Sequence, residues 1–111
     1  MNEHSLTALA DELLDSTRSS GSGRAAVTVY GGQKHELRQT LIALAGGRAL
    51  GEHDSPGEAT LQVLRGEVRL HAGDESWHGA EGSYVHIPPR RHDLEALTDA
   101  VVLLTVAGRA G

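Results

Sequence analysis

Three histidines lie in two short segments where imidazole chemistry is plausible by residue type and spacing. His53 stands in "GEHDSPGE", residues 51–58, and His86 and His92 bracket "HIPPRRH", residues 86–92. Neutral imidazole binds first-row transition metals, and it also accepts and donates protons near neutral pH. The two segments therefore predict either a site for a divalent transition metal (Fe, Zn, Mn or Ni) or metal-free acid–base chemistry.

Nucleophilic catalysis finds little support in the sequence. The chain has no cysteine, and no serine stands in a Gly-x-Ser-x-Gly elbow. Ser55 lies two residues after His53, but no third residue is identifiable that would orient the histidine as a general base. The glycines form no phosphate-binding loop or dinucleotide fingerprint. Any chemistry is therefore expected to centre on the histidines.

The elements that must position these side chains begin with one amphipathic helix. Residues 5–18, "SLTALADELLDSTR", place leucines and an alanine at helical spacing behind Ser5, a suitable N-cap. "SSGSG", residues 19–23, then breaks the pattern. We expect a helix and a Ser/Gly linker over residues 1–23 and a β-domain over residues 24–111. The helix either packs on the outside of that domain or covers a partner subunit or a cavity mouth.

After the linker, the sequence changes to short strands separated by glycine and proline. Strand-like segments occupy residues 25–32, 35–44, 59–77, 82–97 and 100–107, with breaks at Gly66, at "AGDE" and at Pro88–Pro89. Strands this short, with turns this frequent, are typical of an all-β sandwich or barrel. The run "AVVLLTVA" at 100–107 is expected to be a fully buried strand.

The spacing of glycine and histidine resembles the first motif of the cupin family. That motif is a glycine, five residues, His-x-His, three or four residues, Glu, six residues and Gly. Here Gly47 is followed by five residues and His53, and Gly66 stands in register. Where the motif has its second histidine, this chain has Ser55, and where the motif has its glutamate, this chain has Ala59.

The second cupin motif is a glycine, five residues, Pro-x-Gly, two residues and His. Gly82 and Pro88 match it, Arg90 replaces the glycine, and His92 arrives one residue early. The resemblance covers residues 25–107. It implies an all-β fold, the double-stranded β-helix that is also called the cupin or jelly-roll barrel. The short N-terminal α-helix would precede this barrel.

The resemblance also implies which residues would hold a metal. In the family the ligands are the two histidines and the glutamate of the first motif and the histidine of the second. This chain keeps two of those four ligands, His53 and His92. Glu58, next to the glutamate position, and His86 are the candidates to complete a site on that pair.

Alternation along the strands predicts an apolar pocket around the histidines. If Ala59 faces inward, Leu61 shares its face, and His92 shares a face with Leu94. Such a pocket, mostly apolar with few polar groups, is typical of small-molecule sites. The predicted ligand-binding residues are His53, Ser55, Gln39, Leu61, His86 and His92.

Composition narrows the class of partner. The 111 residues carry a formal charge of -5 and no basic stripe, so nucleic acid is not an expected partner. The longest apolar run is too short to span a bilayer, and the N-terminus does not resemble a signal peptide. We expect a cytoplasmic protein without a membrane partner. The cupin resemblance implies a homodimer, with the last apolar strand or the helix involved.

Three functions remain open from the sequence. The loss of two ligands favours a cupin-domain protein that binds a small, largely apolar molecule. Retention of His53 and His92 favours a metal-dependent cupin enzyme of isomerase or dioxygenase type. A structural dimer module is the third reading, since small barrels expose sheet edges. The residues leave enzyme and binding protein equally open.

Overall fold

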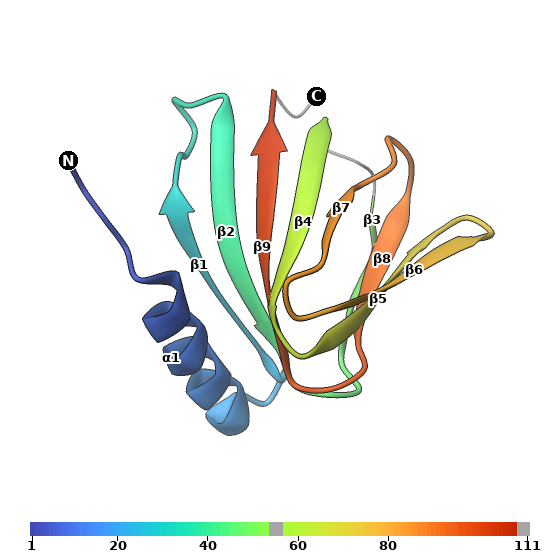
Figure 1. The fold of residues 1–111 in the computed structure, drawn as a ribbon, viewed down its shortest axis with the longest axis horizontal. Coiled ribbons are helices and arrows are strands. Elements are labelled where there is room, and N and C mark those ends of the chain that lie inside the picture. The colour runs from blue at the N-terminus through green and yellow to red at the C-terminus, as the bar shows by residue number, and fades with distance from the viewer. Residues whose placement is uncertain (54–56, 109–111) are drawn as a thin grey trace.

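The computed structural model describes residues 1–53 and 57–108, with only the backbone of His53. This described part contains one helix and nine strands (Figure 1). The helix α1 spans Leu6–Ser19. The strands are β1 Arg24–Tyr30, β2 Leu37–Leu44, β3 Ala49–His53, β4 Glu58–Arg65, β5 Glu67–Ala72, β6 Glu75–Ala80, β7 Tyr84–His86, β8 His92–Ala96 and β9 Ala100–Ala107.

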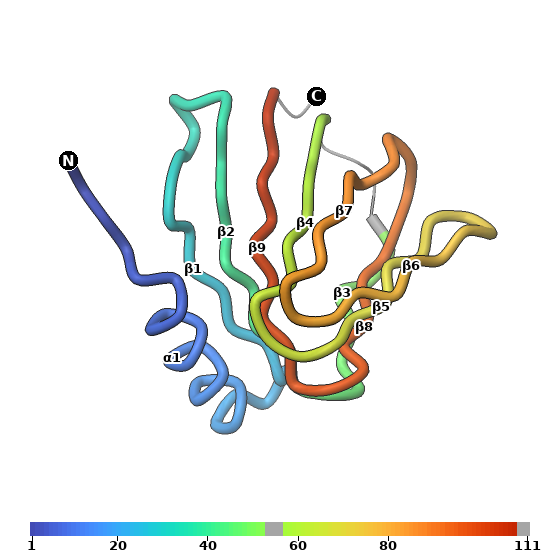
Figure 2. The backbone as a smooth tube through the Cα atoms, viewed as in Figure 1, coloured from blue at the N-terminus to red at the C-terminus, as the bar shows by residue number. Residues whose placement is uncertain are grey.

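The strands form two antiparallel sheets that pack face to face. The larger sheet has the order β1–β2–β9–β4–β7, and the smaller has the order β3–β8–β5–β6. In Figure 2 the β4–β5 and β8–β9 connections lie at the same end of the molecule. This arrangement confirms the predicted jelly-roll fold with a short N-terminal helix. Because β9 pairs with both β2 and β4, association through an edge of this last apolar strand does not fit the topology.

The connection between β4 and β5 crosses from one sheet to the other and depends on glycine. Gly66 has a φ of 75°, a conformation that side chains rarely adopt. A Cβ at this position would lie 2.1 Å from the carbonyl oxygen of Asp99. The neighbouring Glu67 N–H donates to Thr98 Oγ1 at 3.0 Å. The last glycine of the first motif therefore lets this crossing pack closely against the β8–β9 turn.

Alternate residues of the strands fill the space between the sheets. Ala59 and Leu61 of β4 and Leu94 of β8 are buried there, as the alternation predicted. Side chains of a strand point to opposite faces in turn, so one apolar set per strand builds this core. Its buried members are Leu44, Ala59, Leu61, Val63, Val68, Leu70, Ile87, Leu94, Ala96, Ala100, Val102 and Val106.

Helix α1 covers the outer face of the larger sheet. Ser5 caps the helix by accepting a hydrogen bond from the Ala8 N–H at 3.3 Å. Ala10 is fully buried in a second apolar cluster with Leu41, Ala43 and Val101. Of the two positions expected for the helix, the structure shows the one on the outside of the β-domain, beside β1 and β2 (Figure 1). In the part of the chain that the structure describes, no helix is long and apolar enough to cross a membrane.

Ala10→Glu is expected to lower the free energy of unfolding by about 3 kcal/mol, since an unpaired carboxylate would enter a site closed to water. Ala8→Glu is the matched control, because Ala8 is exposed on the same helix. Urea denaturation of both variants measures the difference. Equal losses for the two variants would contradict the docking of α1 through Ala10.

Candidate functional site

His92 begins strand β8, and its side chain lies in the space between the sheets. The residue is 5% exposed, and its Nδ1 lies 2.9 Å from the carbonyl oxygen of Arg90. A carbonyl oxygen only accepts, so Nδ1 carries a hydrogen and donates it. His92 is therefore a buried imidazole whose ring orientation and tautomer are set by the Arg90 carbonyl.

A small chamber adjoins His92, and we call it the His92 chamber. Its volume is ≈ 20 Å³, which is room for about one water molecule. Ligand pockets for drug-sized molecules measure roughly 300–1,000 Å³, so the chamber is far smaller than a ligand site. Apart from His92, the described residues that line it are apolar: Ile42, Leu50, Leu61, Leu70, Ile87, Leu94 and Leu104.

The predicted partner of His92 is only partly placed by the structure. The backbone of His53 lies directly opposite His92 in the β3–β8 ladder. The side chain of His53 and the whole of Ser55 lie outside the described residues. The structure therefore brings the two histidine backbones together, and the contribution of Ser55 stays a prediction.

Two predicted ligand residues lie on the outer face of the larger sheet instead of its interior. Gln39 pairs with Thr105, Thr105 with Thr60, and Thr60 with His86, so these four form one row across the sheet. Residues opposite each other in adjacent strands share a face, and Gln39 Nε2 donates to Thr105 Oγ1 at 3.2 Å. Leu61 has the opposite parity and lines the His92 chamber, as predicted. Gln39 and His86 are thus separated from His92.

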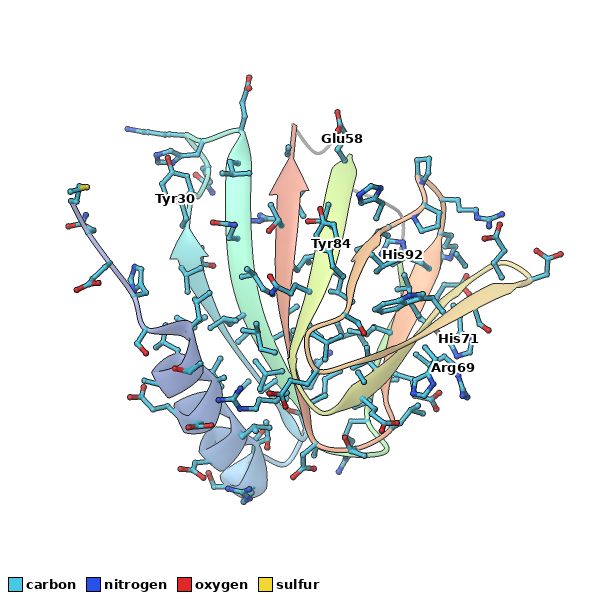
Figure 3. The ribbon with its side chains drawn as sticks, in the orientation of Figure 1. Tyr30, Glu58, Arg69, His71, Tyr84 and His92 are labelled. Carbon is cyan, nitrogen blue, oxygen red and sulfur yellow. The ribbon has the colours of Figure 1, made fainter. Side chains whose placement is uncertain are left out.

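Glu58, the proposed substitute carboxylate, also faces away from the chamber. It begins β4, is exposed, and lies opposite Ala107. Figure 3 shows it at the tip of β4, with His92 deeper in the molecule. Ala59, at the glutamate position of the motif, is 7% exposed and belongs to the core between the sheets. The inward position therefore holds a methyl group where the family has a carboxylate.

The described donors around His92 do not make up a set of metal ligands. Among the described residues, no group of three His, Cys, Asp or Glu side chains comes together. His86 and Glu58, the two residues predicted to complete the site, are both exposed. The other described residues that line the chamber beside His92 are apolar. A transition metal that depends on nitrogen and carboxylate ligands would therefore lack a complete set in this part of the chain.

Glu58 and His86 come together at a second hollow, at the end of the barrel where β4 begins and β7 ends. We call it the mouth pocket; its volume is ≈ 580 Å³, within the range of small-molecule sites. Ile87 lines both this pocket and the His92 chamber, so its side chain lies between them. The lining of the mouth pocket is Gly57, Glu58, Ala59, Thr60, His86, Ile87 and Pro89.

The loop that follows β7 is held by hydrogen bonds and ion pairs. The Ile87 N–H donates to the Ala59 carbonyl at 2.9 Å. Arg90 pairs with Glu75, and Arg91 pairs with Glu52. The two arginines that directly precede His92 in sequence are thus engaged with carboxylates of neighbouring strands. Sequence reasoning missed Ile87, although its apolar character and shared parity with Val85 were available as a signal.

The chain was compared with family models, curated proteins and solved structures, and only solved structures match it. No family model matches the chain, and no curated protein matches it. A conserved protein of unknown function from Streptococcus pyogenes is 27% identical, with a TM-score of 0.72 over 83% of this chain and 80% of that one. An RmlC-like cupin from Desulfovibrio desulfuricans is 24% identical, with a TM-score of 0.74 over 96% of both chains.

An enzyme is also among the similar structures. Salicylate 1,2-dioxygenase from Pseudoaminobacter salicylatoxidans, in adducts with gentisate, is 17% identical, with a TM-score of 0.76 over 90% of this chain. The match spans 31% of the dioxygenase, so it concerns one part of a larger protein. Identity this low bears on the fold and not on the reaction. The likeness to RmlC-like and other cupin structures shows that the chain has their fold.

Proposed function

We propose that this protein is a metal-independent cupin that binds a small molecule in the mouth pocket. The observation that carries the proposal is the pocket itself, ≈ 580 Å³ with three polar side chains on an otherwise apolar lining. Small-molecule sites combine mostly apolar walls with a few placed polar groups. The interior chamber, at ≈ 20 Å³, is too small for that role.

The lining indicates the chemistry of the ligand. Glu58 accepts hydrogen bonds and carries negative charge, while the Thr60 hydroxyl and the His86 imidazole both donate and accept. Ala59 and Ile87 provide apolar contact on the inward side. A compact, largely apolar molecule with an amine or hydroxyl group fits this combination. The amine or hydroxyl would face Glu58, and the apolar part would lie against Ile87.

A ligand that raises the melting temperature of the wild type is expected to lose its effect in Thr60→Tyr, because a tyrosine there would fill the mouth pocket. Gln62→Tyr is the matched control, since Gln62 lies on the same strand and face but does not line the pocket. Strands accept tyrosine readily. A thermal-shift screen of small amines and alcohols measures this. Equal shifts in both variants would overturn the assignment to the mouth pocket.

Metal content tests whether the protein is metal-independent, as proposed. Protein incubated with Fe, Zn, Mn or Ni and then dialysed should retain well under one equivalent by elemental analysis. A chelator should leave the melting temperature and the ligand shifts unchanged. Near-stoichiometric metal that a chelator removes, together with a lower melting temperature, would overturn metal independence.

One observation favours a second candidate function, an enzyme that uses His53 and His92. The β3–β8 ladder places the backbones of these two residues opposite each other, and His92 has a defined tautomer. Paired imidazoles can exchange protons with a substrate. His92→Gln should abolish turnover if this candidate holds, and should leave mouth-pocket binding intact if the protein only binds.

A further inference from the structure

The barrel has an open side where the outermost strands of the two sheets lie near each other. β7 ends the larger sheet and β6 ends the smaller one. In the described part, β7 pairs only with β4 and β6 only with β5. A hollow of ≈ 240 Å³ with walls from both β6 and β7 lies at this opening. We call it the side pocket; it shares His86 with the mouth pocket but none of that pocket's other lining residues.

Trp77 of β6 forms one wall of the side pocket, and its position depends on Gly79. A Cβ on Gly79 would lie 2.1 Å from Cη2 and 2.6 Å from Cζ3 of the indole. The six-membered ring therefore lies directly over the Gly79 backbone. Trp77 also packs against the core between the sheets. The missing side chain at 79 thus lets the indole lie along its strand and present a flat aromatic surface.

The remaining apolar lining completes a slot that suits a ring. Leu70 and Ala72 from β5 line the pocket, Val85 contributes from β7, and Pro88 lies beyond it. A cavity of about 150 Å³ with apolar walls holds one benzene molecule. The side pocket, at ≈ 240 Å³, therefore has room for a substituted ring. Aromatic rings gain from offset or edge-to-face contact with a partner ring such as indole.

Three polar residues, Glu75, Ser76 and His86, line this slot, and Glu75 and His86 define what the ring must carry. Glu75 lines the pocket, and its carboxylate is paired with Arg90, which compensates its charge. His86 also lines it and packs edge-on against Tyr84, with ring centroids 5.5 Å apart. A carboxylate only accepts hydrogen bonds. A neutral ring with a hydroxyl or N–H donor therefore complements the pocket better than an anion.

We propose that the side pocket is a second binding site, which takes a small planar ring compound that bears a hydrogen-bond donor. The ring stacks on Trp77, and the donor reaches Glu75. The site is distinct from the mouth pocket, because Trp77 lines only the side pocket, although His86 borders both. Nothing in it depends on His53 or His92.

The sole tryptophan of the chain makes the site directly observable. Trp77 emission, excited at the red edge of its absorption, should change saturably when phenol is added to the full chain. Cyclohexanol, which is not planar, and benzoate, which is anionic, should change it only weakly. Anisole has the same ring without a donor and should bind several-fold more weakly than phenol. A molecule confined to the mouth pocket would leave the emission unchanged.

Three variants connect the fluorescence change to the side pocket. Ala72→Leu should fill the slot and abolish the saturable response, whereas Ala80→Leu, an exposed position of β6 outside the pocket, should retain it. Glu75→Ala, at an exposed position, removes the acceptor and should erase the difference between phenol and anisole. Linear, unsaturated quenching by phenol in the wild type would overturn the proposal. So would equal saturation in Ala72→Leu and Ala80→Leu, or an unchanged phenol preference in Glu75→Ala.

Discussion

The double variant Ser55→His, Ala59→Glu is expected to bind close to one equivalent of Zn, Mn, Ni or Fe, which the wild type is not. The substitutions restore the two ligands that the first cupin motif has and this chain lacks. Without metal, Ala59→Glu should cost about 3 kcal/mol of stability, because position 59 is 7% exposed and an unpaired carboxylate there is poorly solvated. Bound metal should return that stability, since binding to the folded state alone raises it.

Elemental analysis after dialysis, with melting curves recorded with and without a chelator, measures both effects. Ser55→His, Thr60→Glu is the matched control. It adds the same groups, but residue 60 belongs to the row on the outer face of the sheet. Metal uptake by both double variants would mean that the inward position 59 is not what matters. No uptake by either would mean that the barrel interior does not bring the motif positions together.

The fold was predictable because its signals are local and repeated. Glycines at turns and short alternating strands predicted a barrel, and Gly66 is needed where β4 crosses to β5. In β4 and β8 only one of the two alternating sets is buried. Parity alone therefore placed Leu61 and His92 in the interior. The strand β3 was not predicted as such, because Gly51 and Glu52 interrupt its apolar pattern and its register shifts between Leu50 and His53.

Gln39 shows where parity is not enough. Its strand buries both faces near the C-terminal end, with Leu41 and Ala43 under helix α1 and Leu44 in the core between the sheets. By alternation, Gln39 shares a face with Leu41. Alternation could not show that a helix covers that face, so Gln39 was predicted on the pocket side of the sheet although it lies on the other.

His86 was misplaced for a different reason. Its strand is three residues long, and its neighbours Tyr84 and Val85 gave the two possible parities equal weight. The structure packs Val85 against the core and leaves His86 exposed. Ile87 is buried two residues after Val85 and shares its parity, so the sequence did contain the signal that decides which face His86 is on.

The volume of the His92 chamber depends on how the side chains around it pack together, and no pattern of residue types gives that volume.

Ile87→Ala is expected to join the mouth pocket to the His92 chamber and to destabilise the protein by roughly 2–5 kcal/mol. Ile87 is 7% exposed and is the residue that lines both spaces. Truncation to a methyl group would remove the wall between them and leave a cavity that the surrounding strands only partly close. His92, now 5% exposed, would become reachable by reagents that enter through the mouth.

The rate at which diethyl pyrocarbonate modifies His92, followed by mass spectrometry of the peptide, measures this access. Ile42→Ala is the matched control, because Ile42 lines the chamber but not the mouth pocket. Ile42→Ala removes the same atoms without opening a path from the mouth pocket to His92. It therefore separates access of the reagent to His92 from a general loosening of the core. Modification should be several-fold faster in Ile87→Ala than in Ile42→Ala. Equal rates at matched stability would mean that Ile87 does not separate the two spaces, and that His92 is reached only when the barrel itself opens.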